Sequence, residues 1–421
     1  MGQMFKNYIC ALDIGSSKLA AAAAEIRNRR ILKIFFEHLP LRGIKKGVIT
    51  DAIELVDVTG EALKNLKAKS GIPIKHIYTN FSGQNLIARH SHAVMPLAER
   101  GNKVITASDI QRVNEHARIL GSNLEEEIIH AIPFGYTIDS KNNILNPIGL
   151  YSHKLEVDLY LLSAKVSHLQ SLSHIVNQAG YEIKNVFFSG FACGKAIYNH
   201  KLSGNTDIIC DIGGDTTELL LYRNGILRGI QILPVGGINL TSQLQKSLNI
   251  PFDLAEEIKI THGRIGDYSQ ISEDKEILIK KDSAYKPIKQ KAITEIVTSQ
   301  AQVICRQIKD GIDKLAPSGE INNFIVAGRA ALLEGFLESL EGSLGMALKF
   351  ARIANPDITP AVNKDDAVAG QKYLGLLGVL GILAQAFSSQ YAPAQAPASK
   401  PGRNIFLKTM DKVKEVYQEY F

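Results

Sequence analysis

Two short segments of the chain combine an acid, a glycine and small hydroxyl residues in the same order. The first reads "ALDIGSSKLAA" from residue 11, and the second reads "CDIGGDTTELL" from residue 210. In each, an apolar run ends in an aspartate, and a glycine turn follows. Such a turn exposes consecutive backbone N–H groups, and glycine lets them approach phosphate oxygens closely. One copy is weak evidence, but two copies favour a pair of loops that grip one phosphate chain from opposite sides.

The two aspartates are candidates for a metal site, and the residues after them are candidates for phosphate contacts. Asp13 and Asp211 could hold the water shell of Mg²⁺, an ion that sheds its waters reluctantly. Lys18 adds a positive charge beside the first turn. The other phosphate-binding candidates are Gly15, Ser16, Ser17, Gly213, Gly214, Asp215, Thr216 and Thr217. The alternative is two ordinary β-hairpins with acidic turns, because turn chemistry alone favours Asp and Gly.

The elements that must position these turns follow from the hydrophobic pattern, which predicts an α/β protein. Strand patterns lie at 8–13, 19–25, 31–37 and 74–83, and a helical pattern runs from Ala52 to Ser70. A distinct block at about 84–163 mixes strand patterns with one helix, predicted from Ser108 to Leu120.

After this block the chain returns through a helix predicted at 166–180 to the second turn. Residues 236–310 read as largely helical, with a polar interruption at 266–290. The segment "NNFIVAG" reads as a strand that enters a helix near Ala330. This order predicts two α/β lobes, each with one acid–glycine turn.

Bulk composition is that of a globular protein, with 45% hydrophobic and 21% charged residues among 421. The net charge of +6 permits an anionic partner but does not require one. The four cysteines show no metal spacing, and we expect reduced thiols in a protein core. The apolar segment 373–387 is too short to span a bilayer, and its three glycines predict a closely packed buried helix.

The end of the chain changes character. Residues 388–403 are rich in Pro, Ala, Ser and Gln, which predicts a flexible linker. Residues 404–421 then place large apolar side chains at helical spacing among charged ones. This predicts an amphipathic helix that lies in a membrane interface, or one that docks on a protein surface. Its apolar candidates for membrane contact are Ile405, Phe406, Met410, Val413, Tyr417 and Phe421.

The paired turns resemble the two phosphate loops of the actin superfamily. "AEEIKITHG" (255–263) is similar to the helix that contacts ribose and adenine, and "FIVAGRAALLEGF" (324–336) is similar to the adenosine loop. The block at 84–163 resembles the relocated subdomain of the FtsA family of bacterial cell-division proteins. The resemblance implies an actin-like fold, with two RNase H-like domains around a cleft for ATP and Mg²⁺. It adds these nucleotide contacts: Gly236, Gly237, Glu256, Lys259, Gly328 and Arg329.

The resemblance also implies a division of the chain into subdomains. The first large domain takes residues 1–83 and 164–205, with the inserted subdomain at 84–163 between them. The second takes 206–235 and 306–360, with its own inserted subdomain at 236–305. A connecting helix at 361–387 returns to the first domain, and the linker and amphipathic helix follow.

Three positions depart from the family pattern. Asp215 and Arg329 stand where the second phosphate loop and the adenosine loop usually have a glycine. The connecting segment 185–197 holds no Gln or Glu to orient an attacking water, and its amide is Asn185 at the start. Because hydrolysis depends on that positioning, we expect slow turnover at most.

The function implied by the resemblance is an ATP-binding scaffold that polymerises on the cytoplasmic face of the cell membrane at the division site. Its partners would be the C-terminal peptide of FtsZ, further copies of itself, later divisome membrane proteins and membrane lipids, with no nucleic acid. One alternative is a PilM-like pilus-assembly protein, which lacks a tail of this kind. Another is a kinase or phosphatase of the same fold, which would need a general base in the cleft.

Overall fold

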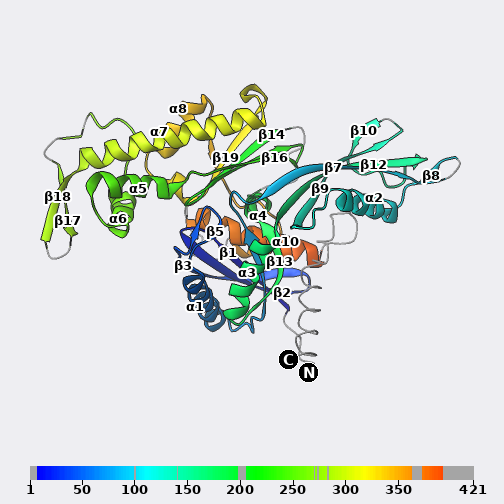
Figure 1. The fold of residues 1–421 in the computed structure, drawn as a ribbon, viewed down its shortest axis with the longest axis horizontal. Coiled ribbons are helices and arrows are strands. Elements are labelled where there is room, and N and C mark those ends of the chain that lie inside the picture. The colour runs from blue at the N-terminus through cyan, green and yellow to red at the C-terminus, as the bar shows by residue number, and fades with distance from the viewer. Residues whose placement is uncertain are drawn as a thin grey trace.

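The computed structural model describes residues 7–98, 101–139, 141–197, 205–269, 271–272, 275–281, 284–362 and 372–391 of the chain. It forms two α/β lobes side by side, and each lobe carries a smaller part that extends away from the centre (Figure 1).

The first lobe is built on a five-stranded sheet in the order β13-β6-β1-β2-β3. Its strands are β1 (Asn7–Ile14), β2 (Lys18–Arg27), β3 (Arg30–Pro40), β6 (His76–Phe81) and β13 (Glu182–Phe188). Five consecutive alanines at 20–24 are buried on β2, alternately toward the two faces of the sheet. Helices α1 (Ala52–Ser70) and α3 (Val166–Gln178) cover one face, and α10 (Leu377–Tyr391) covers the other. Small side chains on both faces let the helices pack closely on this strand.

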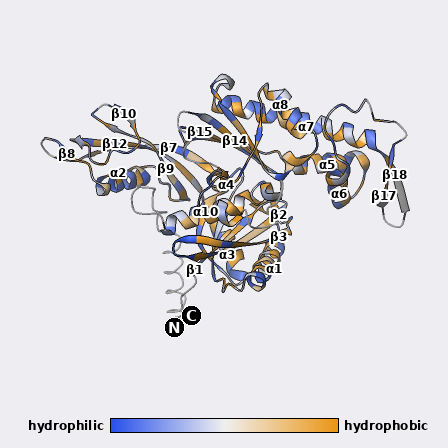
Figure 2. Cartoon of the chain, turned by 180° about the vertical axis from the view of Figure 1, so that it is seen from behind, coloured by the Kyte–Doolittle hydropathy of each residue, from blue (hydrophilic) through white to orange (hydrophobic). Residues whose placement is uncertain are grey.

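The second lobe repeats this plan with a sheet in the order β16-β15-β14-β19-β20. Its strands are β14 (Thr206–Ile212), β15 (Thr217–Arg223), β16 (Ile226–Leu233), β19 (Asn323–Ala327) and β20 (Lys349–Phe350). The long helix α7 (Gln290–Leu315) packs on one face, and α4 (Ser189–Ile197) lies on the other against α10. Figure 2 shows α7 with apolar and polar residues alternating along it, which fits a helix with one buried face.

An inserted unit between β6 and α3 has a core of its own. Its four-stranded sheet has the order β10-β9-β12-β7. The bounds are β7 (Ile87–Pro96), β8 (Lys103–Val104), α2 (Ala107–Leu120), β9 (Glu126–Ile138), β10 (Lys141–Ile144), β11 (Tyr151–Ser152) and β12 (Lys154–Lys165). A capping box between Thr106 and Asp109 begins α2, which packs against β7 and β12.

The opposite end of the molecule is formed by elements of the second lobe (Figure 1). These are α5 (Gly237–Leu248), α6 (Phe252–His262) and the hairpin of β17 (Glu276–Lys281) and β18 (Ala284–Lys289). The polar interruption predicted between helices at 266–290 therefore contains a hairpin, because β17 pairs with β18. The remaining short elements are β4 (Ile44–Lys45), β5 (Val48–Ile49), α8 (Phe336–Leu344) and α9 (Thr359–Val362).

Two predicted boundaries differ from the structure. The helix expected near Ala330 is a 3₁₀ turn at Arg329–Leu332, and α8 begins only at Phe336, after Gly335 in a left-handed conformation (φ 81°). Residues 388–391, expected to begin the linker, belong to α10, which continues to Tyr391, and the rest of the expected linker lies outside the described residues. The four cysteines are free and buried, as predicted. None of the helices within the described residues is long and apolar enough to cross a membrane.

Candidate functional site

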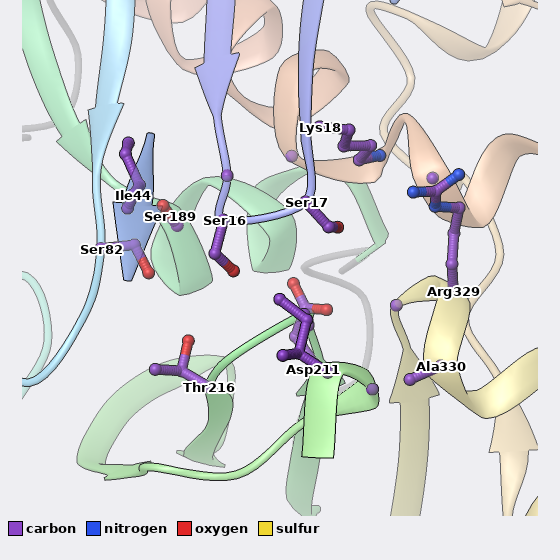
Figure 3. Close-up of a pocket in the computed structure, with 18 of the residues that line it drawn as sticks. Ser16, Ser17, Lys18, Ile44, Ser82, Ser189, Asp211, Thr216, Arg329 and Ala330 are labelled. Atoms are coloured by element: carbon purple, nitrogen blue, oxygen red, sulfur yellow. The ribbon is translucent and has the colours of Figure 1, made fainter. Parts of the chain in front are cut away.

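The two acid–glycine turns face each other across a cavity of about 640 Å³ between the lobes (Figure 3). This volume is typical of small-molecule sites. Most of the residues predicted to bind nucleotide line it: Asp13, Gly15, Ser16, Ser17, Lys18, Asp211, Gly213, Gly214, Thr216, Gly237, Glu256, Lys259, Gly328 and Arg329.

The two turns have the same internal geometry. The Gly15 amide donates to the Lys18 carbonyl at 3.0 Å, and the Gly213 amide donates to the Thr216 carbonyl at 2.9 Å. Each turn joins the strand that ends in its aspartate to an antiparallel partner, β1 to β2 and β14 to β15. The repeated sequence therefore folds into the same hairpin twice, once on each side of the cavity.

The floor of the cavity holds two partly buried carboxylates and one ammonium group. Burial raises the pKa of Asp13, and it raises the pKa of Asp211 to about 6, with the nearby Asp13 adding to the rise. Burial also lowers the pKa of Lys18 to about 8, against the attraction of both acids. A divalent cation would favour the ionised form of both carboxylates.

The donor set fits an ion that keeps most of its own water. Asp13 and Asp211 come from opposite lobes, and within the described part of the chain no three His, Cys, Asp or Glu side chains form a metal cluster. Mg²⁺ held here would take its other ligands from water and phosphate, which is its usual behaviour.

Glycines allow neighbouring elements to approach these acids. A Cβ added to Gly378 of α10 would overlap the Asp13 carboxylate, and one added to Gly328 would lie 2.7 Å from Asp211 Oδ1. Gly328 also has φ 86°, which suits glycine. The start of α10 and the β19 turn thus close the cavity around the two carboxylates.

The far side of the cavity carries an ion pair on α6. Lys259 Nζ donates to Glu256 Oε2 at 2.6 Å and to Thr241 Oγ1 of α5 at 3.0 Å. Arg329 lies across from it, in the 3₁₀ turn, and its side chain reaches past Gly375 toward Lys18.

Three predicted contact residues lie outside the cavity lining. The Asp215 carboxylate turns away and accepts from the Lys46 amide of the first lobe at 3.1 Å. Thr217 is buried, and its hydroxyl donates to the Val235 carbonyl at 2.8 Å. Gly236 packs against the second turn, where an added Cβ would lie 2.5 Å from the Gly214 carbonyl. The tail residues predicted to contact membrane lie outside the described residues.

Several lining residues were not predicted from the sequence, and three of them make polar contacts at or near the two acids. Asn80, near the end of β6, donates to Asp13 Oδ1 at 2.7 Å. Ser82 follows that strand and donates to Glu218 Oε1 at 2.5 Å. Glu218 is 4% exposed and lies directly across the hairpin from Asp211. The signal was present, because strand pairing around the predicted turn brings residue 218 beside residue 211.

Glu218 supplies a carboxylate in the cleft that the segment 185–197, with no Gln or Glu, does not. Its carboxylate lines the cavity from β15 rather than from the connecting segment. Burial, with the nearby Asp211, raises its pKa to about 8. A carboxyl group with a pKa this close to neutral can exchange a proton with water at physiological pH.

Comparisons with known proteins place this geometry in context. Residues 208–378 match the family profile described as "Cell division protein FtsA", and residues 83–163 match the "SHS2 domain inserted in FTSA". The FtsA of Buchnera aphidicola is 25% identical over 426 residues, covering 99% of both chains.

Two solved structures share the fold at low sequence identity. The PilM-PilN type IV pilus biogenesis complex has a TM-score of 0.58 at 16% identity, covering 91% of this chain and 98% of that one. MreB5 of Spiroplasma citri bound to ADP has a TM-score of 0.54 at 12% identity, covering 92% and 99%. Both likenesses concern the fold alone.

Proposed function

This chain belongs to the FtsA family of actin-like cell-division proteins, and from this premise we propose that it binds ATP with Mg²⁺ between its lobes. We further propose that it forms filaments on the cytoplasmic membrane at the division site. The observation that supports nucleotide binding is the pair of equivalent acid–glycine turns facing one cavity. Their amides would hold the phosphates, and Asp13 and Asp211 would hold Mg²⁺ through water.

The nucleoside end of the proposed site is the α6 side of the cavity. Glu256 is already oriented by Lys259 and Thr241, so its carboxylate is available to ribose hydroxyls without rearrangement. Gly328 leaves space beside Asp211, and Arg329 is placed to stack on the base or to reach the phosphates with Lys18. The MreB5 structure, which contains ADP, supports a nucleotide in a cleft of this fold.

Titration calorimetry with ATP and Mg²⁺ tests the site. We expect K18A and D211N each to weaken ATP binding at least tenfold, because each removes a charged group from the phosphate end of the cavity. The control is K64A, on an exposed position of α1, which should bind like the unaltered chain. Unchanged affinity in both K18A and D211N would contradict the assignment.

The partners are proposed from family membership and the tail sequence. Residues 404–421 would lie in the membrane interface, and many copies in a filament would make a weak single-helix attachment stable. The FtsZ C-terminal peptide would bind the second lobe within 236–305, and later division proteins would be recruited to the assembly.

A binding experiment with the FtsZ C-terminal peptide from the same cell separates this proposal from its rivals. We expect capture of the full chain by that peptide and not by a scrambled one. The alternative with a specific observation behind it is a PilM-like role, since PilM shares the fold. Capture by a pilus-assembly membrane peptide, without capture by the FtsZ peptide, would favour that alternative.

We also propose Glu218 as the group that orients water for whatever hydrolysis the site supports. It lies at the phosphate end, beside Asp211, and is held by Ser82 of the other lobe. Because burial keeps much of it protonated at neutral pH, the expected turnover is slow.

A further inference from the structure

The hairpin between β2 and β3 turns through two residues, Asn28 and Arg29, since Arg27 pairs with Arg30. Both turn residues are left-handed, with φ of 51° and 55°. Two-residue hairpins of this kind favour Asn-Gly, because glycine adopts the second left-handed position without strain. Arginine at position 29 is therefore a residue that the turn geometry disfavours.

The second lobe provides an internal comparison. Its equivalent hairpin, between β15 and β16, turns through Asn224 and Gly225, with φ of 54° and 76°. The same fold thus uses the favoured pair in one lobe and a strained arginine in the other. The geometry of the turn therefore does not account for an arginine at position 29, and we look for a role of its charge.

The surroundings of this turn are basic and exposed. Arg27, Arg29, Arg30 and Lys33 are all exposed, and Leu32 among them is 46% exposed. We call residues 27–33 the basic turn. Glu25 is the acid nearest to it on these strands, across from Lys33. Guanidinium groups bind phosphates, and an exposed aliphatic side chain can enter hydrocarbon. This combination therefore suits the surface of a phospholipid bilayer.

The basic turn also lies at the end of the first lobe where α10 ends. α10 begins at the cavity, where Gly378 contacts Asp13 near the end of β1, and then packs along β1 and β2. Its span from Leu377 to Tyr391 is about 21 Å at 1.5 Å per residue. That matches the roughly 20 Å from Asp13 back to Asn7, which is level with Ile26 at the base of the turn. In Figure 1 the last turn of α10 and the end of β2 lie on the same side of the lobe.

We propose that the basic turn is a second membrane contact, which binds anionic phospholipid headgroups when the tail attaches the chain to a bilayer. The inference rests on the proposed membrane attachment and adds to it a fixed orientation of the lobe. Two contacts joined by the short segment after Tyr391 reinforce each other, because the first raises the effective concentration of the second. The lobe would then sit with its cleft turned away from the lipid.

Vesicle co-sedimentation of the full chain tests this contact. R29G removes the charge and relieves the strained turn, so we expect a melting temperature equal to or above that of the unaltered chain. On vesicles with 30% phosphatidylglycerol in phosphatidylcholine, we expect affinity to fall about fivefold for R29G and further for R29G/R30Q. On pure phosphatidylcholine the variants should match the unaltered chain.

The matched control moves the charge to the equivalent turn of the other lobe. R29G/G225R keeps the net charge, and we expect it to bind as weakly as R29G. Equal binding of R29G and the unaltered chain, or recovery in R29G/G225R, would overturn the proposal. Loss of binding to a labelled oligonucleotide without loss on vesicles would also overturn it and assign the turn to nucleic acid.

Truncation after Tyr391 distinguishes this failure from failure of the proposed function. If the truncated chain binds anionic vesicles as well as the full chain does, the tail attachment is wrong. If tail-dependent binding is intact while R29G/R30Q binds normally, the basic turn alone is wrong. If the full chain binds neither kind of vesicle, both proposals fail.

Discussion

Glu218 is a residue whose burial and charged neighbours become clear only in the folded structure. The carboxylate is buried beside Asp211 and accepts from Ser82 across the cleft. A buried acid with its pKa raised to about 8 is a poor base at pH 7 and a better one above it. Under the proposed function, this environment would set both the rate of ATP hydrolysis and its dependence on pH.

We expect E218Q to reduce ATP hydrolysis at least tenfold while leaving ATP affinity within about threefold. The rate of the unaltered chain should rise between pH 7 and pH 9, because deprotonation through the raised pKa makes the base available. Steady-state phosphate release across this range measures both effects. The control is E257Q, at an exposed position of α6. A pH profile that keeps its shape in E218Q would assign the base elsewhere.

The same group makes a separate prediction for stability without nucleotide. The folded-state pKa of Glu218 is raised from 4.5 to about 8, so the folded chain binds this proton more tightly than the unfolded chain. Its stabilising contribution is full below pH 4.5 and is lost as pH rises through 8. We expect the melting temperature to fall between pH 6 and pH 8.5, and E218Q to reduce that fall. Parallel curves for the two proteins would contradict the burial argument.

At the scale of elements, local pattern was enough for the two acid–glycine hairpins and for helix α1. The predicted helix from Ala52 to Ser70 matches α1, because Asp51 caps its start and left-handed Gly71 ends it. Pattern failed at the β17–β18 hairpin, whose strands EILIKK and AYKPIK do not alternate regularly between apolar and polar residues. It also could not give the contact of Asn80 with Asp13 inside the first lobe, or the contact of Ser82 with Glu218 across the cleft, because both depend on how separate elements pack.

The glycines of α10 show what packing adds to pattern. The predicted close approach is present, since an added Cβ at Gly381 would overlap the Ala192 carbonyl of α4. Gly378 has a different neighbour, the Asp13 carboxylate, which places this helix in the proposed metal site. Glycine at position 378 therefore leaves room for the Asp13 carboxylate, which is the proposed metal ligand, as well as for close helix packing.

We expect G378A to weaken Mg²⁺-dependent ATP binding at least tenfold, because the new methyl group displaces the Asp13 carboxylate. Calorimetry with and without Mg²⁺ measures this. The control is G60A in α1, where an added Cβ meets nothing within 4 Å, and which should stabilise the chain by about 0.5–1 kcal/mol. If G378A binds ATP and Mg²⁺ normally, the metal site is not next to α10.

At the scale of the whole molecule, the cleft is bridged by contacts between the lobes. Asp215 accepts from the Lys46 amide, its own amide donates to Ser16 Oγ at 3.1 Å, and Arg42 pairs with Asp253. The departure at Asp215 thus has a structural reason. A carboxylate that would repel phosphate points instead to the Lys46 amide of the opposite lobe, while the Asp215 backbone amide joins the two turns through Ser16.

These bridges should differ in strength. The Asp215 carboxylate is partly buried and bonds to a backbone amide in a left-handed turn, where Lys46 has φ 50°. Such a bond contributes about 1–3 kcal/mol. The Arg42–Asp253 pair is more than 60% exposed on both sides, and an exposed pair contributes about 0–1 kcal/mol. Cleft closure should therefore depend on Asp215 more than on Asp253.

We expect D215A to speed release of a fluorescent ATP analogue about fivefold or more, because the closed cleft loses the stronger bridge while the phosphate contacts stay in place. D253A should change the release rate less than threefold. Stopped-flow displacement by excess ATP measures both rates, and equal melting temperatures would exclude general unfolding as the cause. Faster release from D253A than from D215A would mean that the exposed pair, and not the phosphate-loop acid, holds the lobes together.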